Sequence, residues 1–126
     1  MIVGIGLDVC QITRMKELLE SGRFLERYFS QEEQDYIRQK GAMAPDTMAG
    51  MFAAKEALVK TLGTGFTDTR LTDIVILHDK FGAPYYDLRG EFALHASQRN
   101  ITSLHLSITH DGGVAAAVAI AEWAEK

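Results

Sequence analysis

Three charged residues, Lys55, Glu56 and Lys60, interrupt a stretch of small and apolar residues that runs from 51 to 65. A helix that is apolar almost all round is buried, and a buried helix rarely carries charge without a partner. Glu56 and Lys60 are four positions apart and therefore share one helix face. They form either an exposed ion pair that adds about 0.3 kcal/mol to the helix, or a carboxylate and an ammonium directed into a site.

A further candidate acid, Asp8, stands at the end of a predicted strand over residues 2–8. Side chains alternate between the faces of a strand, so Gly4 and Gly6 share a face with Asp8. Two glycines beside an acid allow a helix or a ligand to approach the backbone closely. Asp8 either caps the helix that follows the strand or joins Glu56 in a site.

Asp8 and Glu56 are the acids that fall inside otherwise apolar elements, and together they could form a metal site. Two carboxylates in a dry site repel each other unless a cation neutralises them. Oxygen ligands without a cysteine or histidine cluster favour a hard ion such as Mg²⁺, which takes one or two carboxylates and completes its shell with phosphates and waters. Lys60 could then hold a phosphate oxygen. Such a site would catalyse transfer at a phosphoester by positioning and charge neutralisation.

Glycine and histidine supply further candidates around this centre. Gly63 is placed to end the helix in a left-handed turn, and Gly65 keeps the following loop small and mobile. His110 ends a predicted strand beside the turn residues at 111–113. A histidine in this place is either structural or a partner for a ligand phosphate.

Hydrophobic periodicity and turn residues predict an α+β fold, with a largely antiparallel sheet wrapped around one long buried helix. Ser30 and Glu33 predict a capping box at the start of one helix, and Asp46 is predicted to cap the long helix. We expect residues 1–126 to form a single domain. The predicted helices are 11–21, 23–29, 30–40, 47–62 and 90–99, and the predicted strands are 2–8, 72–78, 85–88, 103–110 and 114–121.

Composition excludes several classes of protein. With 126 residues, 47% of them apolar, the chain can form a real core, and its net charge of −4 argues against nucleic-acid binding. A single cysteine, Cys10, rules out a disulfide framework and agrees with a cytoplasmic location. We find no signal peptide and no run of about 18 apolar residues that could span a membrane. The mixed charges at 14–40 indicate a solvated face, although they include a possible basic patch.

Three stretches in combination resemble one family, the holo-[acyl-carrier-protein] synthases, which are the small phosphopantetheinyl transferases. The stretches are GIGLD at 4–8, FAAKEA at 52–57 followed by Lys60 and GTG at 63–65, and SITHD at 107–111. Their order, their spacing and the total length agree with the family. The resemblance therefore covers essentially the whole chain.

The resemblance implies that the protein transfers 4′-phosphopantetheine from coenzyme A to a serine of apo acyl carrier protein and releases adenosine 3′,5′-bisphosphate. It also implies a homotrimer with the site between protomers, and Mg²⁺ bound by Asp8 and Glu56 together with the coenzyme A diphosphate. The implied catalytic residues are Asp8, Glu56 and Lys60, the implied coenzyme contacts are Lys60, Gly63, Gly65 and His110, and the implied contacts to the acidic carrier protein are Arg14 with Arg23 and Arg27 beside it.

The chain departs from the family at Met51 and Ala83, where many relatives carry basic residues that tend to hold the 3′-phosphate of coenzyme A. We therefore expect weak discrimination between coenzyme A and 3′-dephospho-coenzyme A. Two alternatives to the transferase stay open. One is a Mg²⁺-dependent phosphohydrolase acting on a nucleotide. The other is a trimeric ligand-binding protein in which Asp8 caps a helix and Glu56 pairs with Lys60 at the surface.

Overall fold

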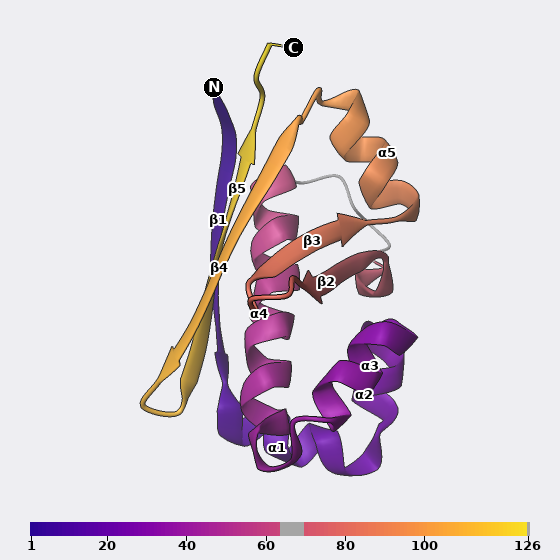
Figure 1. The fold of residues 1–126 in the computed structure, drawn as a ribbon, viewed down its shortest axis with the longest axis vertical. Helices are drawn as coiled ribbons and strands as arrows, with labels where there is room; N and C mark the ends of the chain where they lie inside the picture. Colours follow the sequence, from indigo (N-terminus) through magenta and orange to yellow (C-terminus); the bar gives the residue numbers. More distant parts are fainter. Residues whose placement is uncertain (64–69, 126) are drawn as a thin grey trace.

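The central element of the fold is α4, Ala44–Leu62, which runs between a three-stranded sheet and a two-stranded hairpin (Figure 1). The computed structural model describes residues 1–63 and 70–125. All strand pairs within these residues are antiparallel. The expected α+β fold, with antiparallel strands around a long buried helix, is confirmed, and the strands are divided into two sheets.

The larger sheet lies along one side of α4 with its strands in the order β1-β5-β4. These strands are β1 (Ile2–Gln11), β5 (Val114–Glu122) and β4 (Ser103–Asp111). The two glycines of β1 bring its backbone against the helix, because a Cβ at Gly4 or Gly6 would overlap the carbonyl oxygens of Thr61 and Ala57. The predicted close approach at these glycines is therefore confirmed, and the approaching element is a helix.

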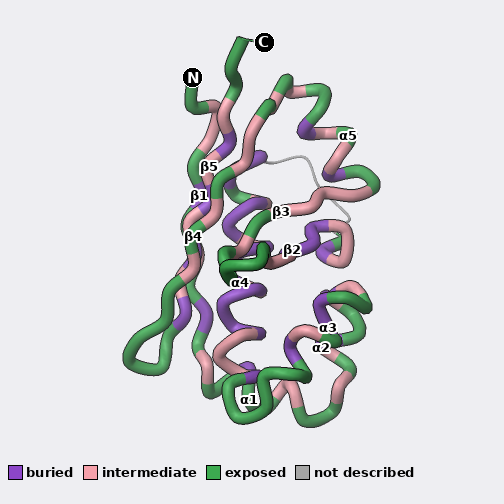
Figure 2. Tube along the Cα trace, viewed as in Figure 1, coloured by how far each residue is buried: buried purple, intermediate pink, exposed green. Residues whose placement is uncertain are grey.

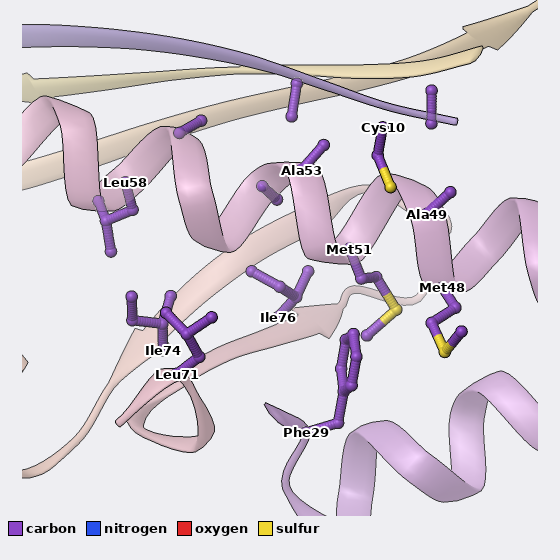
Figure 3. Packing of buried hydrophobic residues seen from close by; sticks show 14 of the residues in the cluster. Cys10, Phe29, Met48, Ala49, Met51, Ala53, Leu58, Leu71, Ile74 and Ile76 are labelled. Carbon is purple, nitrogen blue, oxygen red and sulfur yellow. The ribbon is translucent and has the colours of Figure 1, made fainter. Parts of the chain in front are cut away.

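The smaller sheet is a hairpin on the other side of α4. Its strands are β2 (Ile74–His78) and β3 (Pro84–Leu88). Figure 3 shows Leu58 directed toward the hairpin and Ala53 directed toward the larger sheet. The strand predicted at 72–78 begins at residue 74, because Leu71–Asp73 form a 3₁₀ turn.

Four further helices surround these layers. They are α1 (Ile12–Ser21), α2 (Arg23–Tyr28), α3 (Gln31–Arg38) and α5 (Gly90–Gln98). The first three gather near the amino end of α4, and α5 lies near its carboxyl end (Figure 1). The predicted capping box is confirmed: the Glu33 N–H donates to the Ser30 hydroxyl, and the Ser30 N–H donates to the Glu33 carboxylate. Within residues 1–63 and 70–125, no helix is long and apolar enough to cross a membrane.

Both ends of α4 differ from the prediction. The helix begins at Ala44 rather than at residue 47, so Asp46 lies in its first turn and is not the N-cap. Pro45 explains the earlier start, because the first turn tolerates a residue that lacks an N–H. At the other end, Gly63 has the expected positive φ of +85°, but its ψ of −171° belongs to an extended, glycine-only conformation instead of a left-handed turn.

The outer face of the larger sheet leaves apolar side chains in solvent. Ile5, Leu7 and Val9 of β1 point away from α4 and are 61%, 60% and 62% exposed. Figure 2 shows that buried residues are instead concentrated along α4 and at the strand positions beside it. An exposed apolar strand face of this kind is typical of a surface that another protein covers.

Candidate active site

Asp8 and Lys60 meet at the β1 edge of the larger sheet. The Lys60 Nζ donates hydrogen bonds to Asp8 Oδ1 at 2.8 Å and to the Leu7 carbonyl oxygen at 3.1 Å. The Asp8 side chain is 20% exposed and the Lys60 side chain 56% exposed. The hydrogen bond to Asp8 raises the pKa of Lys60, so the side chain stays an ammonium. The pair is therefore charged and open to a ligand.

Glu56, one turn before Lys60, completes a cluster of two carboxylates and one ammonium. Partial burial raises the pKa of Glu56, the nearby charge of Asp8 raises it further, and Lys60 opposes both effects. Within the described part of the chain, no group donates a hydrogen bond to the Glu56 carboxylate. Two carboxylates that repel each other in a partly buried space form a site that a bound cation would stabilise.

This geometry decides between the interpretations that the sequence left open. Lys60 forms its ion pair with Asp8 and not with Glu56, so the exposed i,i+4 pair is not formed. The N-cap of α1 is Gln11, which lacks a side-chain cap, so Asp8 does not cap that helix. The ligand-binding alternative relied on both of these contacts and loses its structural basis.

Arg14 lies on α1, the helix that directly follows β1 and its Asp8. Burial raises the pKa of the Cys10 thiol, Arg14 lowers it, and Asp8 and Glu56 raise it. The charges of Arg14, Asp8 and Glu56 therefore all act on this thiol, which follows Asp8 by two residues in β1. The arginines of the possible basic patch are all exposed: Arg14, Arg23 and Arg27.

His110 lies on the opposite edge of the same sheet. It belongs to β4, whereas Asp8 belongs to β1, and β5 separates the two strands. Neighbouring strands are about 4.8 Å apart, which puts the two edge backbones about 10 Å apart. The His110 Nδ1 lies 3.9 Å from Asp46 Oδ2, and both residues line a hollow of about 420 Å³ together with Lys40 and Met51. Within one chain, His110 is therefore not brought to Asp8.

Of the two glycines expected to contact the coenzyme, only Gly63 lies within the described residues. Gly63 follows the last turn of α4, where its N–H donates to the Lys60 carbonyl oxygen at 3.3 Å. The Arg99 guanidinium donates to the adjacent Leu62 carbonyl oxygen and holds this end of the helix. Gly63 thus lies one turn beyond Lys60 at the end of α4, and Gly65 lies outside the described residues.

The donor set of the site fits Mg²⁺. Within residues 1–63 and 70–125, no group of three or more His, Cys, Asp or Glu side chains is arranged to hold a metal ion. Asp8 and Glu56 offer hard oxygen donors, and the Cys10 thiol beside them is buried with a raised pKa. Mg²⁺ suits two carboxylates because it takes its other ligands from substrate phosphates and water.

A second charged cluster is a buried ion pair that no local sequence pattern predicts. Lys55 Nζ lies 2.7 Å from Glu33 Oε1, and both side chains are fully buried. Lys55 therefore faces the interior, away from the site of its neighbour Glu56. The sequence signal was a lysine within a buried helix, which requires a partner. Glu33 is that partner, although its local sequence pattern indicates only the capping box with Ser30.

Comparisons with known proteins identify the chain's family. The model of the 4′-phosphopantetheinyl transferase superfamily matches residues 4–119. The chain belongs to this superfamily. The holo-[acyl-carrier-protein] synthase of Treponema denticola is 40% identical to this transferase over 122 residues, which cover 97% of the chain and 99% of the relative. The resemblance drawn from three short motifs is therefore confirmed, and the protein is an enzyme of this family.

Solved structures carry the same fold as this transferase. Holo-[acyl-carrier-protein] synthase from Neisseria meningitidis superposes with a TM-score of 0.86 at 30% identity, covering 97% of this chain and 99% of that chain. The synthase from Helicobacter pylori, solved in complex with coenzyme A, superposes with a TM-score of 0.78 at 34% identity, covering 94% of this chain and 99% of that chain. The predicted fold thus agrees with the family's solved structures.

Proposed function

We propose that this transferase, as a single domain over residues 1–126, moves 4′-phosphopantetheine from coenzyme A to a serine of apo acyl carrier protein in the cytoplasm. The cluster of Asp8, Glu56 and Lys60 carries the proposal, because it combines a phosphate-binding cation with two acids suited to Mg²⁺. The names of the relatives and the coenzyme A complex of one of them support the choice of substrates.

In the proposed reaction, the serine hydroxyl oxygen forms a bond to the phosphorus on the pantetheine side of the coenzyme A diphosphate. The bond from that phosphorus to the bridging oxygen breaks, and adenosine 3′,5′-bisphosphate leaves with the electron pair. The serine proton passes to a carboxylate of the site, Asp8 or Glu56. The products are the phosphopantetheinylated carrier, the bisphosphate and one proton.

The charged residues divide the work of positioning. Lys60 is held by Asp8 and the Leu7 carbonyl oxygen with its side chain 56% exposed, so its ammonium can bind a phosphate oxygen of the diphosphate. Asp8 and Glu56 would hold Mg²⁺, which would neutralise the charge that develops on the leaving bisphosphate. The rigid helix α4 keeps Glu56 and Lys60 one turn apart during the reaction.

We expect the active form to be a homotrimer with shared sites, as the family resemblance implies. Asp8 and His110 lie on opposite edges of one sheet, so a second copy is needed to bring a His110 edge to an Asp8 edge. Contacts of this head-to-tail kind form closed rings when the rotation closes. The exposed face of Ile5, Leu7 and Val9 offers apolar area for such an interface.

We expect the carrier protein to bind at Arg14, Arg23 and Arg27. These arginines are exposed on α1 and α2, and Arg14 follows Asp8 by six residues in the sequence. The whole chain carries a net charge of −4, so attraction of an acidic carrier requires a local basic patch of this kind.

Mass spectrometry of apo acyl carrier protein tests the proposal. The carrier is incubated with the enzyme, coenzyme A and Mg²⁺, with and without EDTA. We expect a gain of one phosphopantetheine on a serine, and no gain when EDTA is present. An unmodified, competent carrier would contradict the proposal, and release of coenzyme A fragments without any carrier would favour the phosphohydrolase.

A further inference from the structure

The buried pair of Lys55 and Glu33 takes no part in the proposed reaction, although Lys55 directly precedes Glu56 in the sequence. Lys55 Nζ donates to Glu33 Oε1 at 2.7 Å, to the Tyr28 carbonyl oxygen at 2.9 Å and to the Leu71 carbonyl oxygen at 2.8 Å. The Phe29 ring centre lies 4.6 Å from the same nitrogen. The ammonium therefore has a partner for each of its three protons.

The Glu33 carboxylate is bonded just as completely. Besides Lys55, it accepts the N–H of Ser30 at 2.9 Å and the N–H of Ile76 at 3.0 Å. Burial lowers the pKa of Lys55 to about 8, and the charge of Glu33 opposes this shift. Four backbone groups, two carbonyls and two N–H groups, thus depend on this one ion pair. They belong to the end of α2, the start of α3, the 3₁₀ turn at Leu71–Asp73 and the middle of β2.

The dependence matters for α2, which is the shortest α-helix in the described part of the chain. It has six residues, starts at Gly22 without a side-chain cap, and exposes Arg23 and Arg27. A helix of this length does not persist in water without tertiary contacts. Its contacts with the body of the protein include buried Leu25, the rings of Phe24 and Tyr28 against Phe52, and the bond from Lys55 to the Tyr28 carbonyl oxygen.

We propose that Lys55 and Glu33 are positioning residues for recognition of the carrier protein. The pair fixes the carboxyl end of α2 on α4, and so holds Arg23 and Arg27 at a set distance from Glu56. This inference rests on the proposed function, because it takes α2 as part of the carrier-binding surface.

The coenzyme side of the site is held by different contacts. The glycines of β1 press against the last turns of α4, and Lys60 reaches Asp8 directly. The Tyr86 hydroxyl donates to the Ala54 carbonyl oxygen at 2.6 Å and ties α4 to the hairpin. Loss of the buried pair should therefore release α2 while the metal and coenzyme ligands keep their places.

The test is a steady-state comparison of three proteins. The double variant Lys55→Met/Glu33→Gln removes both buried charges together, so neither is left unpaired. Tyr86→Phe is the matched control, since it removes a buried hydrogen bond from the neighbouring turn of α4 without touching α2. KM is measured separately for apo carrier protein and for coenzyme A, below the unfolding transition of every variant, and amide exchange is followed at residues 23–28.

We expect the double variant to raise KM for the carrier about tenfold, to leave KM for coenzyme A unchanged, and to speed exchange in α2. Tyr86→Phe should lower the unfolding temperature and leave both KM values unchanged. If the double variant does not fold, Glu33→Gln alone decides, because the Gln amide oxygen can still accept the hydrogen bond from Lys55. The expected rise in carrier KM is then about two- to threefold. Equal changes in both KM values, or an unchanged carrier KM in folded variants, would overturn the inference.

Arg14→Ala and Arg27→Ala separate this inference from the proposed function. If both leave the carrier KM unchanged, the assigned carrier surface is wrong, and the inference falls with it. If they raise the carrier KM and the pair variants do not, the carrier surface stands and the positioning role of Lys55 and Glu33 is wrong.

Discussion

Lys55 and Glu56 are consecutive residues of one helix, and their charges have opposite surroundings. Lys55 is fully buried and gives three hydrogen bonds to three acceptors. Glu56 is half-buried beside a second carboxylate, and within the described residues nothing donates to it. The Lys55 ammonium has all its hydrogen-bond acceptors within the protein, whereas the Glu56 carboxylate is available to bind a ligand.

The difference shows how one helix can serve structure and chemistry at once. A buried charge that meets all its partners fixes the segments that supply them, and removing one partner is costly. A carboxylate kept near a like charge lowers stability, and such local conflicts are expected at functional sites. The helix turn of about 100° per residue separates the two environments.

The largest expected effect is loss of transfer in Glu56→Gln. We expect the rate to fall about a thousandfold, since the variant removes a metal ligand and a possible base. The same change should raise the free energy of unfolding by up to about 1 kcal/mol, because it removes a partly buried charge that Asp8 repels. Urea unfolding and carrier modification are measured on the same preparation. A variant that is destabilised as well as inactive would place Glu56 among the structural residues.

The second largest effect is a loss of stability in Lys55→Met, in contrast to the gain expected for Glu56→Gln. This change leaves Glu33 charged and buried without its partner, so we expect a loss of about 3–5 kcal/mol in unfolding free energy. Tyr86→Phe serves as the matched control, with an expected loss of about 1 kcal/mol. A loss no larger than that of the control would show that the buried pair contributes little beyond one hydrogen bond.

A smaller effect concerns pH. The raised pKa of Glu56 means that the folded protein binds a proton more tightly there than the unfolded chain does. Its contribution to stability is complete below the ordinary value of 4.5 and is lost as pH rises through the folded-state pKa. We therefore compare the free energies of unfolding of the wild type and of Glu56→Gln in EDTA. The wild-type value minus the variant value should fall as the pH rises above 4.5. A difference that stays constant with pH would contradict the raised pKa of Glu56, which we attribute first to its partial burial and then to the charge of Asp8.

The smallest effect is expected at the other edge of the sheet. Met51 is buried and Ala83 is exposed, and neither brings charge to the hollow beside His110. We expect kcat/KM for coenzyme A to exceed that for 3′-dephospho-coenzyme A by less than about tenfold, or 1.4 kcal/mol. A preference of several hundredfold would mean that another group holds the 3′-phosphate.

Local patterns predicted those parts of the site that depend on neighbouring residues. Strand alternation placed Gly4, Gly6 and Asp8 on one face, and the helix period placed Glu56 beside Lys60. Both are short-range facts of the chain, and the structure agrees with them. The start of α4 was missed, although Pro45 signals it, because Asp46 is also a good capping residue.

Contacts between distant segments were beyond these patterns. From the sequence, Lys60 could pair with either Glu56 or Asp8. It pairs with Asp8, which is 52 residues away, because β1 packs across α4. The Lys55–Glu33 pair spans 22 residues and joins elements whose relative placement no periodicity sets. The position of His110 on the far edge follows from the strand order, which the sequence does not specify.

The most direct test is the intact mass of apo acyl carrier protein after incubation with coenzyme A, Mg²⁺ and either wild-type enzyme or Glu56→Gln. Glu56 is assigned to the reaction and not to the fold. We therefore predict that the wild type adds one phosphopantetheine, while the folded variant adds none in the same time. Modification by Glu56→Gln at the wild-type rate would contradict the assignment of the Asp8 and Glu56 cluster as the reaction centre.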